Sequence, residues 1–76
     1  MDRIEAMLKG IRPEFDFAAS SDFIADGLLD SFDMVTLVAD LDKTFSISID
    51  GVEIVPENFK NIETIRALLQ KHGITT

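Results

Sequence analysis

Ser31 is the residue of this sequence whose type and position could carry chemistry. It lies between Asp30 and Phe32, where an acidic loop meets a strongly periodic apolar segment. A hydroxyl at the start of a helix either caps the helix by accepting a backbone N–H, or stays free and can be modified. A serine cap is best supported by Glu or Gln three residues later, and that position holds Met34. Both uses therefore remain open for Ser31.

Asp30 offers an alternative cap for the same helix. Aspartate caps helices about as well as serine does, and Asp33 in the first turn suits the positive end of the helix dipole. If Asp30 is the cap, Ser31 becomes the first helical residue and its hydroxyl is unused. The backbone N–H groups at this end favour a phosphodiester bonded to the serine oxygen, whereas the charges of Asp30 and Asp33 oppose it by repulsion.

Other familiar kinds of reactive site are not supported by the sequence. The chain has no cysteine, so it offers no thiol, no disulfide and no cysteine-based zinc site. Its one histidine, His72, is far along the chain from Ser31, and we interpret it as a cation at the C-terminal end of a helix. No glycine-rich phosphate loop and no metal-spaced His or Cys cluster occurs. We therefore expect a protein that is not an enzyme and holds no metal.

The loop before Ser31 partly resembles a calcium-binding loop. The EF-hand pattern is matched at positions 1, 5, 6 and 12 by Asp22, Asp26, Gly27 and Asp33. Position 3, however, holds Ile24, which cannot bind a cation, and Asp33 replaces the bidentate glutamate. We therefore expect no calcium site here.

Size and charge indicate one small acidic domain. The 76 residues, 46% of them hydrophobic, suffice for a single domain over 1–76 with one small core. Fourteen acidic and seven basic residues give a net charge of −7, which disfavours nucleic acid and favours a partner with a basic patch. Acidity alone also keeps a small protein soluble. With no signal peptide and no membrane-length apolar run, we expect a cytoplasmic monomer without membrane insertion.

The positions of Ser31 and its neighbours depend on three main predicted helices. The first spans Asp2–Lys9, is capped by Asp2, and ends at Gly10 and Pro13. The second spans 31–45, and the last begins after Asn61 as its cap and ends near His72.

The connections complete the predicted fold. Pro56 opens a short fourth helix through Phe59, and residues 46–50 form an extended loop because no other strand could pair with them. Residues 14–30 form a long loop whose apolar side chains hold it across the core. We predict an all-α fold, a small four-helix bundle with its longest loop between the first two main helices.

The helix predicted over 31–45 has three distinct sides at about 100° per residue. The side toward the core contains Met34, Leu37, Val38, Leu41 and Phe45. The opposite side contains Asp33, Thr36, Asp40 and Lys43. A third stripe contains Phe32, Val35 and Ala39 and is unusually apolar for a side that should be partly exposed. The stripe either packs against the rim of the loop or is contacted by a partner protein.

These features resemble those of a known family. The segment Leu29-Asp30-Ser31-Phe32-Asp33, followed by the apolar helix to Phe45, resembles the attachment region of acyl carrier proteins, whose motif is Asp-Ser-Leu at the start of the second long helix. Residues 54–59 and 61–65 also resemble carriers, and look closest to freestanding D-alanyl carrier proteins and related discrete carriers. The likeness extends over residues 4–69. It favours Ser31 as a modified serine.

The resemblance implies a carrier rather than a catalyst. A phosphopantetheinyl transferase, using magnesium of its own, would move 4′-phosphopantetheine from coenzyme A onto Ser31. The thiol of that arm would carry an acyl or aminoacyl group as a thioester from an activating ligase to a downstream acyltransferase. An imported thiol fits a chain without cysteine. The alternatives are a non-carrier acidic interaction module of the same fold or, among carriers, a fatty-acid, polyketide or peptidyl carrier.

The resemblance also implies that partners with basic patches dock on the second helix. The matching positions are Asp30, Phe32, Asp33, Thr36, Ala39 and Asp42. Phe32 stands where Leu is commoner, and Thr36 and Ala39 stand where fatty-acid carriers usually present an acid and a Met. This face is less acidic and more apolar than that of a fatty-synthesis carrier, which favours a dedicated activating enzyme. Docking between opposite charges should weaken with added salt.

Overall fold

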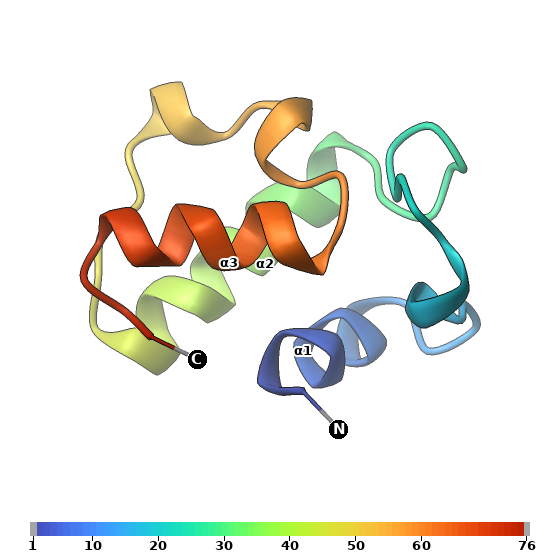
Figure 1. The fold of residues 1–76 in the computed structure, drawn as a ribbon, viewed down its shortest axis with the longest axis horizontal. Helices are drawn as coiled ribbons and strands as arrows, with labels where there is room; N and C mark the ends of the chain where they lie inside the picture. Colours follow the sequence, from blue (N-terminus) through green and yellow to red (C-terminus); the bar gives the residue numbers. More distant parts are fainter. Residues whose placement is uncertain (1, 76) are drawn as a thin grey trace.

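The computed structural model describes residues 2–75, and all its regular structure is helical (Figure 1). The α-helices are α1 (Arg3–Ile11), α2 (Ser31–Phe45) and α3 (Ile62–Lys71), with 3-10 turns η1 (Phe17–Ala19), η2 (Gly51–Glu53) and η3 (Pro56–Asn58). No strand occurs within residues 2–75. The predicted all-α class with three main helices is confirmed. The predicted fourth helix is a single 3-10 turn, which begins with Pro56 as expected.

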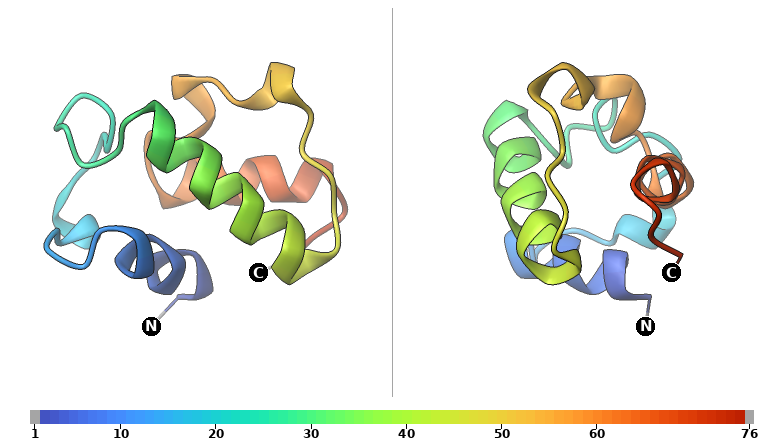
Figure 2. Two further views of the ribbon diagram at one scale, coloured as in Figure 1. Left: turned by 180° about the vertical axis from the view of Figure 1, so that it is seen from behind. Right: turned by 90° about the vertical axis from the view of Figure 1, so that its left-hand side faces the viewer.

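The helices surround one hydrophobic core. In the right-hand view of Figure 2, α2 and α3 lie on opposite sides of the molecule, with α1 on a third side and the connection from α2 to α3 on the fourth. The amphipathic spacing of each helix turns its apolar side inward. The buried side chains of this core are Ile4, Leu8, Phe17, Phe23, Leu29, Met34, Leu37, Val38, Leu41, Ile49, Phe59, Ile65, Leu68 and Leu69.

The long loop between α1 and α2 belongs to this core, as its apolar residues predicted. Phe17, Phe23 and Leu29 are buried, and the rings of Phe17 and Phe23 meet edge to face with centroids 5.1 Å apart. The Phe23 N–H also donates to the carbonyl of Lys60, 2.6 Å away, which ties the loop to the segment before α3. The loop is therefore fixed both by its packing in the core and by this hydrogen bond where it leads into α2.

The predicted end of the first helix is wrong by two residues. Asp2 caps α1 as expected, but the helix continues through Gly10 to Ile11. A glycine costs a helix only about 1 kcal/mol relative to alanine, and Ile11 packs partly against the core. Pro13 cannot continue the hydrogen-bond ladder, so α1 ends before it and leaves Arg12 as its C-cap.

The second half of the chain agrees with its predicted caps and connections. Asn61 caps α3 by accepting the Thr64 N–H at 2.9 Å, and His72 is the C-cap of the same helix. Ser46 adopts a left-handed conformation, φ 55°, which ends α2. Residues 47–50 carry no regular secondary structure, Asp50 is extended, and the turn η2 that follows was not predicted. No helix within residues 2–75 has the length and apolar character needed to cross a membrane.

Candidate functional site at the start of α2

Asp30, and not Ser31, caps α2. The Asp30 backbone is extended, and its Oδ1 accepts the Asp33 N–H at 2.9 Å. In return Asp33 Oδ2 accepts the Asp30 N–H at 3.1 Å, so the two carboxylates form a reciprocal capping box. The alternative in which Ser31 is the cap is thereby excluded, and the serine is the first residue of the helix.

The Ser31 side chain is consequently available. Ser31 is exposed, and within residues 2–75 its hydroxyl forms no hydrogen bond. The N–H groups of the first helical turn lack intrahelical acceptors, which gives this end a partial positive charge. Chemically, the arrangement offers an accessible alcohol whose oxygen can form an ester, at a helix end that favours an anionic substituent.

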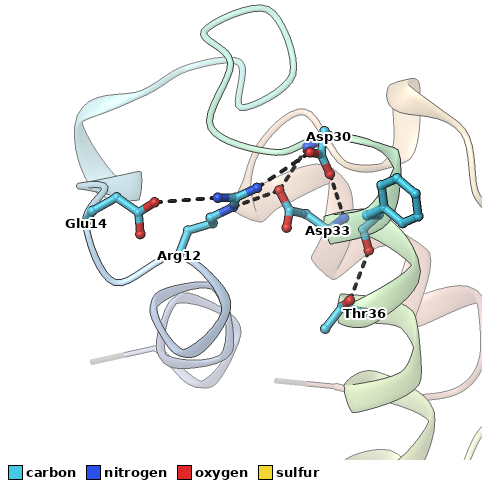
Figure 3. Close-up of polar contacts among 6 residues, drawn as sticks. Arg12, Glu14, Asp30, Asp33 and Thr36 are labelled. Atoms are coloured by element: carbon cyan, nitrogen blue, oxygen red, sulfur yellow. Dashed lines mark hydrogen bonds and ion pairs between the residues drawn. The ribbon is translucent and has the colours of Figure 1, made fainter.

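Arg12 joins the capping box to the end of α1 (Figure 3). Its Nε lies 3.0 Å from Asp33 Oδ2, and its Nη2 lies 3.5 Å from Asp30 Oδ2. Its Nη1 lies 3.6 Å from Glu14 Oε2. The hydrogen bond to Asp33 raises the pKa of Arg12. The pKa of Asp30 is lowered, first by the hydrogen bond from the Asp33 N–H. Desolvation acts in the opposite direction, and the positive charge of Arg12 lowers this pKa further.

Asp33 does not lie where helical periodicity placed it. The prediction put it on the side opposite the core, but Asp33 is buried, with 8% of its surface exposed. As the third residue of the helix it turns back to accept the Asp30 N–H, and Arg12 meets it from the far side. The periodicity of α2 contains no information about a partner that lies 21 residues earlier in the chain.

The apolar stripe of α2 faces outward. Phe32 is 84% exposed and Val35 is 57% exposed, and Thr36 and Ala39 on the same helix are also exposed. The interpretation that this stripe packs against the rim of the loop is therefore wrong. The Thr36 hydroxyl donates to the carbonyl of Phe32 at 3.0 Å (Figure 3).

The last predicted docking residue, Asp42, has a structural contact. It is half-buried, and its Oδ1 accepts the Ile49 N–H at 3.0 Å, which fixes the connection that leaves α2. Ser31, Phe32, Thr36 and Ala39 are thus brought to one exposed side of α2, with Asp30 exposed at its start. Asp33 and Asp42 are engaged inside the fold.

The acidic residues of the partial calcium pattern are used in local hydrogen bonds. Asp22 Oδ1 accepts the N–H groups of Ile24 and Ala25 at 3.1 and 3.0 Å. Asp26 Oδ2 accepts the Ser20 hydroxyl at 2.6 Å. Each carboxylate thus stabilises the turn in which it lies.

Sequence reasoning did not single out Arg12, although it is central to the site. The carboxylate of Asp33, which is buried and accepts the N–H of the cap residue Asp30, requires a cationic partner, so an arginine at the end of another element is the expected signal. Arg12 could be predicted as this partner only if the burial of Asp33 were already known.

Comparison with known proteins identifies a curated relative. The chain is 34% identical over 71 residues to aminoacyl carrier protein 1 of Bradyrhizobium diazoefficiens, and the match covers 90% of this chain and 79% of that protein. No protein-family model matches the sequence. No solved structure matches it either.

Proposed function

The chain belongs to the acyl carrier protein family, and from that premise we propose that it carries aminoacyl or acyl groups on 4′-phosphopantetheine attached to Ser31. One observation carries the proposal. The serine of the Asp-Ser motif is exposed and its hydroxyl is unused by the cap, because Asp30 has taken that role. An alcohol in this state can be esterified without breaking any contact of the fold.

The helix end at which Ser31 lies favours a phosphodiester in this position. The bond that forms joins Ser31 Oγ to the phosphorus of the pantetheine phosphate, and the diphosphate bond of coenzyme A breaks. Adenosine 3′,5′-bisphosphate leaves, and the hydroxyl proton passes to a base of the transferase. The N-terminal end of α2 then favours the phosphodiester charge. Once bound, the arm supplies a thiol on which cargo is carried as a thioester.

We further propose that the outer side of α2 is where partner enzymes dock. Phe32 and Val35 offer exposed apolar surface beside Ser31, and such surface is typical of interaction sites. Asp30 adds a charge at the start of the helix, and the net charge of −7 favours basic partners. Thr36 and Ala39 extend the surface along the helix. Docking roles for Asp33 and Asp42 stay predictions, to be tested against their contacts within the fold.

The proposed cargo class is aminoacyl. The curated relative is named an aminoacyl carrier protein, and the face beside Ser31 lacks the acidic residue that fatty-acid carriers usually present at the position of Thr36. The proposed partners are a phosphopantetheinyl transferase, an adenylating ligase that loads the thiol, and an acyltransferase that unloads it. In this scheme the protein is a substrate and carrier of these enzymes and acts in the cytoplasm.

Intact mass tests the attachment. The protein is incubated with coenzyme A, magnesium and a broad-range phosphopantetheinyl transferase, and modification adds about 340 Da. Ser31→Ala should abolish the addition without harm to the fold, because Asp30 remains the cap. Ser48→Ala, which changes another exposed serine, is the matched control and should be modified like the wild type.

An unmodified wild type, under conditions that modify a known carrier, contradicts the proposal and favours the non-carrier interaction module. Modification that persists in Ser31→Ala would assign the arm to another residue. Once the arm is attached, a second mass increase with ATP, an amino acid and an adenylating ligase tests the cargo class. An increase only with a fatty acid and its ligase would replace aminoacyl by fatty acyl.

A further inference from the structure

The phosphodiester proposed for Ser31 has a charge problem at its site. Asp30 precedes the serine and Asp33 follows two residues later, and both carboxylates lie at the same helix end. Two negative charges there oppose the approach of a diphosphate and the charge of the product. Without a further cation, the partial positive charge of the helix end would have to offset the repulsion from both carboxylates.

Arg12 is the cation that meets both carboxylates. It contacts them through different nitrogen atoms, Nε at 3.0 Å from Asp33 and Nη2 at 3.5 Å from Asp30. Figure 3 shows the guanidinium with Glu14 on one side and the two aspartates on the other. Because Asp33 is buried, its carboxylate needs a charged partner, and the planar guanidinium also fixes its orientation.

We propose, as an extension of the proposed function, that Arg12 is a positioning residue for the modification of Ser31. It ties the first turn of α2 to the end of α1, which holds the backbone at Ser31 in one position when the transferase binds. It also lowers the negative potential that a phosphate group meets at this end of the helix. Arg12 acts through Asp30 and Asp33 and touches neither the hydroxyl nor the reacting phosphorus.

The chain contains a matched control for this role in Arg66. Arg66 of α3 forms an ion pair with Asp2, which is the N-cap of α1. It therefore also ties one helix to the acidic cap of another, and its side chain is 30% exposed against 37% for Arg12. The difference is that no candidate modified serine follows Asp2. Loss of Arg66 should weaken the fold in a comparable way and leave Ser31 modification intact.

The test compares initial rates of modification for the wild type, Arg12→Ala, Arg12→Lys and Arg66→Ala. The probe is coenzyme A with magnesium and one phosphopantetheinyl transferase, followed by intact mass at a temperature where circular dichroism shows each variant folded. We expect Arg12→Ala to lower kcat/KM about tenfold. Arg66→Ala should remain within about twofold of the wild type. Arg12→Lys, which keeps the charge but loses the fork, should lie between Arg12→Ala and the wild type.

Three results overturn the inference: a wild-type rate in Arg12→Ala, an equal loss in Arg66→Ala, or no recovery in Arg12→Lys. The second result would make Arg12 a merely structural residue. If Arg12→Ala does not fold, Arg12→Lys is compared with Arg66→Ala instead: a rate below both the wild type and Arg66→Ala supports the role, and a rate equal to either overturns it. An unmodified wild type would instead refute the proposed function, whereas equal modification of wild type and Arg12→Ala refutes only the role of Arg12.

Discussion

The two sides of α2 differ in what covers them. On the inner side Met34, Leu37, Val38 and Leu41 are buried in the core. On the outer side Ser31, Phe32, Val35 and Ala39 are exposed. Burial of one large aliphatic side chain stabilises a fold by about 1.5–3 kcal/mol, whereas an exposed one contributes little. The same helix therefore stabilises the fold with one side and leaves the other exposed to solvent.

The strongest test of this division is a pair of truncations on opposite sides. Leu37→Ala removes a fully buried side chain and should cost about 2–5 kcal/mol in the free energy of unfolding. Val35→Ala shortens a side chain that is 57% exposed and should stay within about 0.5 kcal/mol. Urea unfolding followed by circular dichroism measures both. Equal losses would mean that the outer side also supports the fold.

The reverse pattern is expected for binding. Phe32 is 84% exposed, so Phe32→Ala should leave stability unchanged, yet it should weaken docking of the partner enzyme by about 1–2 kcal/mol. The matched control is Val52→Ala, which shortens another strongly exposed apolar side chain, 80% exposed, on the turn η2. The KM for this protein as the transferase substrate reports the effect. A larger KM change in Val52→Ala than in Phe32→Ala would move the docking surface away from α2.

The sequence was sufficient to predict the extent of α2 and its core side, because helical periodicity is a local property. It predicted the helix and the unusual apolar stripe, and it left the cap open between Ser31 and Asp30. It failed for Asp33, whose burial depends on Arg12 at the far end of a long loop. It also failed at Gly10, where tertiary packing of Ile11 extends α1 past a residue that disfavours helix. Contacts between distant segments were thus the part that local patterns could not supply.

A smaller effect is expected at the start of α2, where the two sides meet. Asp30→Ala removes the capping oxygen and should lower the melting temperature by a few degrees. Asp30→Asn keeps a capping oxygen and should lose only what the charge contributes. Thermal unfolding by circular dichroism compares them. If Asp30→Asn is as damaging as Asp30→Ala, the contact with Arg12 matters more than the cap.

The smallest expected effect is the pH dependence of the stability lost in these variants. It separates the contribution of charge from that of packing. The pKa of Asp30 is lowered in the fold, first by the Asp33 N–H and also by Arg12. A carboxyl whose pKa is lower in the folded state stabilises the fold above its unfolded pKa of about 3.9, and this stabilisation is lost as the pH falls through the folded pKa.

The stability difference between the wild type and Asp30→Asn should therefore be constant above about pH 5 and shrink on acidification below about pH 4. The loss in Leu37→Ala should not change over the same range, because it removes only apolar contacts. Urea unfolding at several pH values measures both differences. A pH-independent difference for Asp30→Asn would mean that the carboxylate contributes through its shape and not its charge, and that the outer start of α2 is stabilised in the same way as its inner side.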